Sequence, residues 1–167
     1  TSEIAIHAAL TGHLVISTLH TNDAVGTISR LLDMGTEPYL ISSALICVAA
    51  QRLVRRICDG CKTEEEATPE LMAELGVRVK GRAPVFYRGK GCPACKDTGY
   101  KGRIGIYEVL VPDDDLRALM LAKKDASAIF DAARRKGFQS LRIQGLKAAA
   151  AGYTTVEEVL QATQVLE

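Results

Sequence analysis

The sequence predicts an α/β domain that carries a four-cysteine metal-binding segment and ends in a series of helices. Residues 13–19 are rich in β-branched and apolar side chains and lie between stretches of helical periodicity, the pattern of a buried strand flanked by helices. Two C-x2-C pairs follow, separated by 30 residues. Most of the chain beyond the second pair has helical periodicity.

The composition is that of an ordinary globular protein. Hydrophobic residues make up 47% of the 167 residues and charged residues 25%, which is enough apolar material for a core. The net charge of +1 favours neither nucleic acid nor an anionic membrane as a partner. No run of about 18 apolar residues and no secretory signal occurs. Because the chain opens at Thr1 in helical-looking sequence, we expect a fragment of a longer protein.

Residues 1–57 are expected to form the first unit, with the order helix, strand, helix, helix. Asn22 or Asp23 can cap the second helix, and Gly35 can end it. Pro38 fits the first turn of the last helix. The helices are expected at residues 3–10, 23–34 and 38–57, and the strand at 13–19.

Residues 58–103 are expected to form a second unit that depends on a metal ion. The segment contains a possible short helix from Pro69 and a strand at 84–88, with several glycines between. So little apolar material cannot build a core of its own, which is the condition under which small domains need a metal.

Cys58, Cys61, Cys92 and Cys95 are the expected ligands of one structural zinc ion. A C-x2-C turn directs two thiolates at one ion, and two such turns complete a tetrahedron with no open position for catalysis. Disulfides are disfavoured without a secretory signal, whereas an iron–sulfur cluster stays open as an alternative. Cys47 lies in an apolar run and is expected to be buried.

Residues 104–167 are expected to form a third unit, in which a strand at 104–111 precedes a C-terminal helical subdomain. The last helix carries a capping-box pattern, Thr155 with Glu158 three residues later. The helices are expected at 113–122, 125–136, 139–151 and 155–163.

His13 and His20 stand at the two ends of the predicted strand. Seven extended residues span about 23 Å, so the two rings are not expected to share a ligand. Chemistry alone favours a structural or surface role for each histidine.

The stretch TGHLVISTLHTNDA at residues 11–24 resembles the His box of the secretion ATPases, the ring-forming motors of type II secretion and type IV pilus assembly. The resemblance covers nearly the whole chain. The cysteine quartet indicates the assembly and secretion branch, because retraction motors of twitching motility generally lack it. The other matching stretches are residues 30–35, 50–56, the cysteine pairs, 99–108 and 157–160.

The resemblance implies the C-terminal portion of a RecA-like ATPase domain that forms a homohexamer with ATP sites at the subunit interfaces. It implies that His20, and less directly His13, lie near the γ-phosphate, and that Arg30 and Arg103 face the nucleotide. It further implies a cytoplasmic protein, peripheral to the inner membrane, that uses ATP and Mg²⁺, works with the platform proteins of the pilus or secretion machine, and binds no nucleic acid.

The family's phosphate-binding loop, G-x-x-x-x-G-K-[ST], does not occur in these 167 residues, and neither does its acidic Mg²⁺ strand. We therefore expect ATP hydrolysis from the intact parent and none from this fragment alone.

A zinc-ribbon nucleic-acid-binding module is the alternative interpretation. Residues 51–107 carry twelve Lys and Arg against seven Asp and Glu, and Tyr87, Tyr100 and Tyr107 lie among them. The basic residues are scattered, which counts against this interpretation, whereas salt-dependent DNA binding would favour it.

Overall fold

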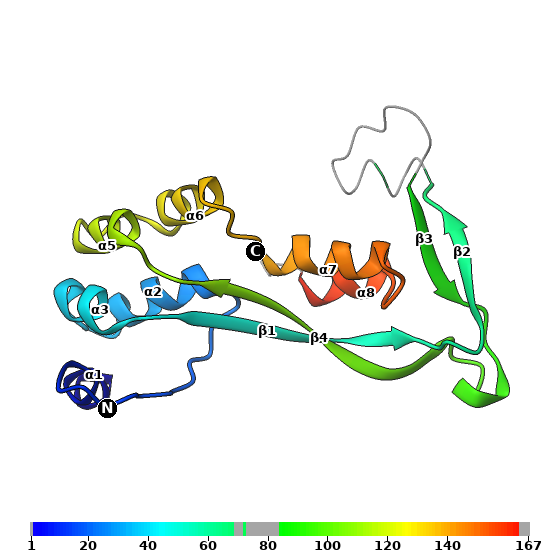
Figure 1. The fold of residues 1–167 in the computed structure, drawn as a ribbon, viewed down its shortest axis with the longest axis horizontal. Coiled ribbons are helices and arrows are strands. Elements are labelled where there is room, and N and C mark those ends of the chain that lie inside the picture. The colour runs from blue at the N-terminus through cyan, green and yellow to red at the C-terminus, as the bar shows by residue number, and fades with distance from the viewer. Residues whose placement is uncertain (1, 69–71, 73–83, 164–167) are drawn as a thin grey trace. The chain divides into compact units, whose positions relative to one another are not determined.

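The computed structural model describes residues 2–68, 72 and 84–163 (Figure 1). The short helix predicted from Pro69 lies outside the described residues. Within the described part, no helix is both long and apolar enough to cross a membrane. The elements are α1 (Ser2–Leu10), α2 (Ala24–Asp33), α3 (Pro38–Ala44), β1 (Val48–Ile57), β2 (Lys62–Glu66), β3 (Val85–Gly89), the 3-10 turn η1 (Pro93–Cys95), β4 (Tyr100–Leu110), α5 (Asp114–Leu121), α6 (Ala126–Arg135), α7 (Leu141–Ala150) and α8 (Val156–Ala162).

The chain divides into two compact units, and each unit is built from two separate segments. Unit 1 comprises Thr1–Gln51 and Tyr107–Ser140, and unit 2 comprises Arg52–Ile106 and Leu141–Glu167. Strand β1 pairs with β4, and β2 pairs with β3. The division into units at 1–57, 58–103 and 104–167 stays a prediction.

The predicted start and end of α2 are confirmed. Asp23 is the N-cap residue, and its carboxylate accepts a hydrogen bond from the backbone N–H of Gly26 at 2.6 Å. Val25 and Ile28 are buried in the core of unit 1. Gly35 has φ +83°, the left-handed conformation that ends helices and that glycine adopts without a steric penalty.

The strand predicted at residues 13–19 is wrong for this chain. Residues 13–20 form neither helix nor strand, and their side chains face solvent; Leu14 is 76% and Ile16 is 87% exposed. A strand forms only where a neighbouring strand takes its backbone hydrogen bonds, and neither of the two sheets among the described residues includes this segment.

The single helix predicted at residues 38–57 is also wrong. Helix α3 ends at Ala44, Leu45 is already extended, and β1 begins at Val48. A continuous apolar run fits a buried helix and a buried strand equally well, and pairing with β4 decides in favour of the strand. Cys47 precedes β1 and is exposed, so its predicted burial is wrong.

The four C-terminal helices α5 to α8 are confirmed close to their predicted positions, as is the strand that became β3. The predicted strand at 104–111 is confirmed as part of a longer one, since β4 begins at Tyr100. Strand β2 was not expected, because its sequence KTEEE favours no strand; it pairs antiparallel with β3, with Lys62 opposite Gly89. In unit 2, α7 and α8 share a core of four buried residues, which are Ala149, Val156, Val159 and Leu160. The partly buried side chains of Phe86 and Leu146 pack against this core.

Candidate metal centre and histidine segment

Four cysteine sulfurs in unit 2 form one cluster. The sulfurs of Cys58, Cys61, Cys92 and Cys95 all lie within 4.8 Å of one another. The Sγ–Sγ distances are 3.8 Å for Cys58 and Cys92, 3.9 Å for Cys61 and Cys95, and 3.7 Å for Cys92 and Cys95. A tetrahedral zinc ion with Zn–S bonds of about 2.3 Å requires sulfurs about 3.8 Å apart, whereas a disulfide requires about 2.05 Å. The cluster therefore has the donor set and spacing of a four-thiolate metal site.

Backbone hydrogen bonds bring the two cysteine turns together. Cys58 directly follows β1, and its N–H donates to the carbonyl of Gly99 at 2.9 Å. The N–H of Lys90 donates to the carbonyl of Cys61 at 3.0 Å. These two bonds join residues of the first cysteine turn to segments that flank the second turn in the sequence.

Two glycines allow the chain to pass closely beside the cluster. A β-carbon added to Gly99, whose φ is +77°, would lie 2.5 Å from the carbonyl oxygen of Gly89. That separation is far inside van der Waals contact, and the positive φ strains other residues. From the sequence, Gly89 and Gly99 were predicted only to lie in turns.

Backbone N–H groups stabilise one thiolate of the cluster. The N–H groups of Cys92 and Gly99 donate to Sγ of Cys95 at 3.2 and 3.3 Å. Burial alone would raise the pKa of Cys95, but hydrogen bonds from these two N–H groups, together with those of the Cys92 and Cys61 side chains, lower it to about 6. Burial raises the pKa of Cys61 instead. The two N–H donors thus favour the thiolate form of Cys95, which is the form that binds a metal.

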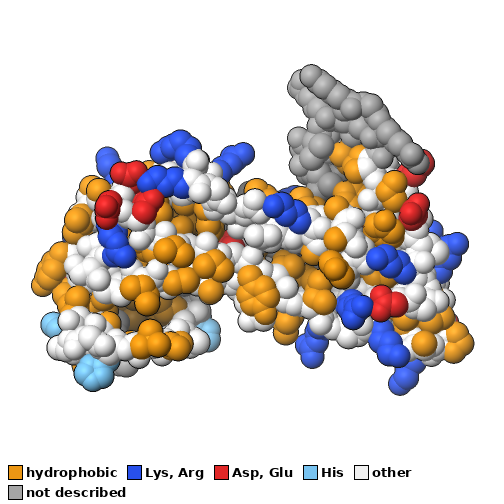
Figure 2. Space-filling model, viewed as in Figure 1, with side chains coloured by type: hydrophobic (Ala, Val, Ile, Leu, Met, Phe, Trp, Pro, Cys, Tyr) orange, Lys and Arg blue, Asp and Glu red, His pale blue; other side chains and the backbone are white. Residues whose placement is uncertain are grey.

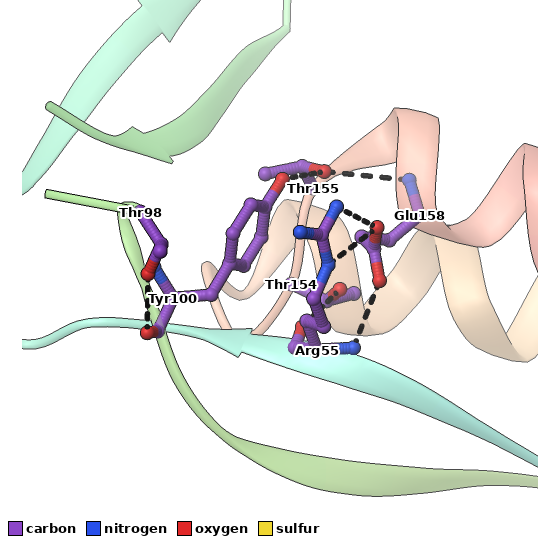
Figure 3. Close-up of polar contacts among 6 residues, drawn as sticks. All are labelled: Arg55, Thr98, Tyr100, Thr154, Thr155 and Glu158. Carbon is purple, nitrogen blue, oxygen red and sulfur yellow. Dashed lines mark hydrogen bonds and ion pairs between the residues drawn. The ribbon is translucent and has the colours of Figure 1, made fainter. Parts of the chain in front are cut away.

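An ion pair connects β1 to α8 in the same unit (Figure 3). The guanidinium of Arg55 donates to the Oε1 atom of Glu158, with Nε at 2.9 Å and Nη2 at 2.5 Å, while the backbone N–H of Arg55 donates to Oε2 at 3.0 Å. This hydrogen bonding lowers the pKa of Glu158 and raises that of Arg55. Glu158 binds Arg55 here, so only the Thr155 half of the predicted capping box is present: Thr155 Oγ1 accepts from the N–H of Glu158 at 3.4 Å.

Tyr100 joins β4 to the same group. The guanidinium of Arg55 stacks over its ring, 4.1 Å from the centroid, and its hydroxyl is 3.0 Å from Oγ1 of Thr155 (Figure 3). Thr154 Oγ1 donates to the carbonyl of Arg55 at 2.8 Å. Sequence reasoning missed this network, because its hydrogen bonds between the strands and the C-terminal segment join residues 55 to 103 positions apart and follow no periodicity.

The four residues predicted to face the nucleotide are exposed. His13 and His20 belong to the extended segment of unit 1, and Arg30 lies on α2 in the same unit. Arg103 lies on β4 in unit 2. Histidine side chains are visible at the surface in Figure 2, where Lys and Arg side chains are spread over the visible face. Exposure leaves these groups accessible to a ligand, and their roles stay predictions.

Comparison with known proteins decides the family. Residues 1–161 match the family model described as type II/IV secretion system protein. The chain belongs to that family. The resemblance identified in the sequence is thereby confirmed.

Two curated members of the family illustrate the relationship. The chain is 52% identical over 164 residues to the type IV pilus assembly ATPase PilB of Thermus thermophilus, covering 98% of this chain and 18% of the relative. It is 48% identical to the type II secretion system protein E of Pseudomonas aeruginosa, covering 98% of this chain and 32% of that protein. The chain thus spans roughly a fifth to a third of the length of these relatives.

A solved structure agrees with the fold. The pilus retraction motor PilT with bound ADP superposes with a TM-score of 0.64 over 99% of this chain and 36% of that chain, at 23% identity. At that identity the likeness concerns the fold alone. The mixed α/β class predicted from the sequence is confirmed.

Proposed function

We propose that this chain is the C-terminal portion of a RecA-like, hexameric ATPase that powers type IV pilus assembly or type II protein secretion. The observation that carries the proposal is the 52% identity, over 98% of this chain, to a pilus assembly ATPase. The 48% identity to a type II secretion protein E leaves both machines as candidates. The phosphate-binding loop and the Mg²⁺-binding acidic strand would belong to a part of the parent outside these 167 residues.

Within this proposal, the four cysteines hold a structural zinc ion in an inserted subdomain. Their sulfur spacing and the N–H donors to Cys95 support it. The ion would link the end of β1 to the turn before β4. The proposed C-terminal helical subdomain is supported only for α7 and α8, which share a core in unit 2, whereas α5 and α6 belong to unit 1.

His20, and less directly His13, would lie near the γ-phosphate, and Arg30 and Arg103 would each face the nucleotide region. An imidazole at position 20 can hydrogen-bond the γ-phosphate or the attacking water, and arginines can neutralise phosphate charge. The exposure of all four side chains supports a role in binding rather than in the core. The parent would act in the cytoplasm at the inner membrane, with platform proteins of the pilus or secretion machine as partners.

The test compares two histidine variants of the full-length parent. His20→Ala should lower kcat for ATP hydrolysis about 10-fold or more, because a charge-assisted hydrogen bond in the transition state is worth roughly 1.5–3 kcal/mol. The affinity for nucleotide should change less, since binding rests mainly on the phosphate-binding loop. His7→Ala, which changes another exposed histidine of unit 1 on α1, is the matched control and should leave kcat within about twofold of wild type.

Two results would contradict the proposal. The 167-residue chain alone should hydrolyse no ATP above background, so turnover that survives a contaminant control would mean that the catalytic groups have been misassigned. A His20→Ala parent that is destabilised but fully active would make His20 a structural residue.

A further inference from the structure

Glu108 is a buried carboxylate in unit 1 with no assigned role. It lies on β4, is 2% exposed, and accepts a hydrogen bond at 2.5 Å from the backbone N–H of Ala24, which lies 84 positions away. Burying a carboxylate costs free energy unless hydrogen bonds compensate it, and neighbouring positions on the same strand face, Ile106 and Leu110, are apolar. A carboxylate at this position therefore calls for an explanation beyond packing.

The residue that Glu108 binds lies at the start of α2, four positions after His20. The intervening turn is held by further hydrogen bonds: Thr21 Oγ1 lies 2.8 Å from Thr27 Oγ1, and the carboxylate of Asp23 accepts from the N–H of Gly26 at 2.6 Å. By contrast, residues 13–20 belong to no strand or helix and are exposed. His20 thus lies at the boundary between an exposed extended segment and a turn held by hydrogen bonds.

The carboxylates of Asp23 and Glu108 both bind N–H groups at the start of α2 but have different structural roles. Asp23 caps the helix locally by accepting a hydrogen bond from the N–H of Gly26, and one such side-chain cap is a common way for a helix to begin. Glu108 belongs to a distant strand, so its bond to Ala24 adds a connection between the helix start and β4 that the cap cannot provide. Both carboxyl groups bond to N–H groups at the N-terminal end of α2, where the helix dipole favours acidic side chains.

We propose that Glu108 is a positioning residue for the ATPase reaction: by holding the start of α2 on β4, it sets the place of His20. This inference rests on the proposed function, because the role of His20 is itself proposed there. Removing the Glu108 carboxylate would leave the His20 ring intact but free to move with the turn, so transition-state contacts would weaken more than ground-state nucleotide binding.

The experiment uses the full-length parent and measures kcat and KM for ATP with Glu108→Ala, Glu108→Gln and Asp125→Ala. Glu108→Ala should lower kcat toward the roughly 10-fold loss expected for His20→Ala, with KM changed less than about threefold. Glu108→Gln keeps an oxygen acceptor for the N–H of Ala24 and should recover most of the lost kcat. Asp125→Ala removes a comparable cap, at the start of α6 in the same unit, and should leave the kcat of folded enzyme unchanged.

A double variant distinguishes a positioning role from a merely structural one, because it tests whether the losses of kcat at Glu108 and His20 are additive. If Glu108 acts through His20, adding Glu108→Ala to His20→Ala should lower kcat little further, because both remove the same interaction. If Glu108→Ala fails to fold, Glu108→Asp, which keeps the charge and withdraws the oxygen by one methylene, takes its place in the same cycle.

The failures of the two proposals are distinguishable. A wild-type parent with no ATPase activity would overturn the proposed function and this inference with it. An active parent in which the Glu108 variants keep full kcat, or lose as much kcat with His20 absent as with it present, would overturn the inference alone. Loss of kcat in Asp125→Ala equal to that in Glu108→Ala would also overturn it, since any lost helix cap would then have the same effect.

Discussion

Replacing Gly145 by Ala sets helix propensity against packing in unit 2. Gly145 lies inside α7, where alanine is favoured over glycine by about 1 kcal/mol in an exposed helix. In the structure, however, Gly145 is buried against α8. A β-carbon at this position would lie 2.5 and 3.0 Å from the two methyl groups of Val159 and 3.2 Å from Cδ1 of Ile106.

The expected magnitude follows from these three distances. Carbon atoms in contact lie about 3.5–4.0 Å apart, so the new methyl group is about 1 Å too close to Val159. Val159 is fully buried, and a valine in a helix has one strongly preferred rotamer, so it cannot rotate away cheaply. Overpacking costs about 1–3 kcal/mol, and the propensity gain offsets about 1 of these. We expect a net loss of about 1 kcal/mol in the free energy of unfolding, or about 2–4 °C in Tm.

Urea and thermal unfolding followed by circular dichroism would measure this loss. Val159→Ala removes the two methyl groups that clash, so Gly145→Ala should be neutral or stabilising in that background, giving a coupling free energy of about 1 kcal/mol or more. If Gly145→Ala instead raises Tm in the otherwise unchanged protein, helix propensity outweighs the packing cost. The contact between α7 and α8 would then have room for the added methyl group.

Three further predictions concern the cysteine cluster and its surroundings. The purified chain should contain about one zinc ion per molecule by elemental analysis, and Cys92→Ser should release zinc and unfold residues 58–103 first; an equally well-folded metal-free protein would contradict this. Glu158→Gln should lower the free energy of unfolding by roughly 1 kcal/mol at pH 7, a charged hydrogen bond discounted for the half-exposed Arg55. Because Arg55 lowers the pKa of Glu158 from 4.5, this contribution is present above about pH 4.5 and is lost as the pH falls through the lower folded pKa, so wild type and variant should converge in acid unfolding curves. Gly99→Ala should accelerate the loss of zinc to a chelator, because its methyl group would clash with the carbonyl oxygen of Gly89. An unchanged rate of zinc release would show that the close approach of Gly89 and Gly99 is not needed to hold the ion.

The features that the sequence predicted correctly depend on residues close together in the chain. The cap of α2 at Asp23 and its end at Gly35 involve bonds that span three or four positions. The same holds for helices α5 to α8, whose periodicity repeats within each helix. The cysteine pairs were recognised from the spacing within each turn, and the family from the stretch at residues 11–24.

The features that it missed depend on partners far away. Residues 13–19 have the composition of a strand, yet no described strand pairs with them, whereas KTEEE became β2 because β3 lies beside it. The run before Cys58 was predicted as helix, and pairing with β4 made it β1. Strand formation needs a neighbour to accept its hydrogen bonds, and local composition does not say whether one is present.

By itself, the sequence determined the family, the helix boundaries set by caps and glycines, and the four thiols that can bind one metal ion. Only the tertiary structure decided that Arg55 binds Glu158 and that Glu108 binds the N–H of Ala24. These partners are 103 and 84 positions apart. Helical and strand periodicities relate only residues a few positions apart. Contacts over such long sequence separations depend on the path of the whole chain, so no local sequence pattern predicts them.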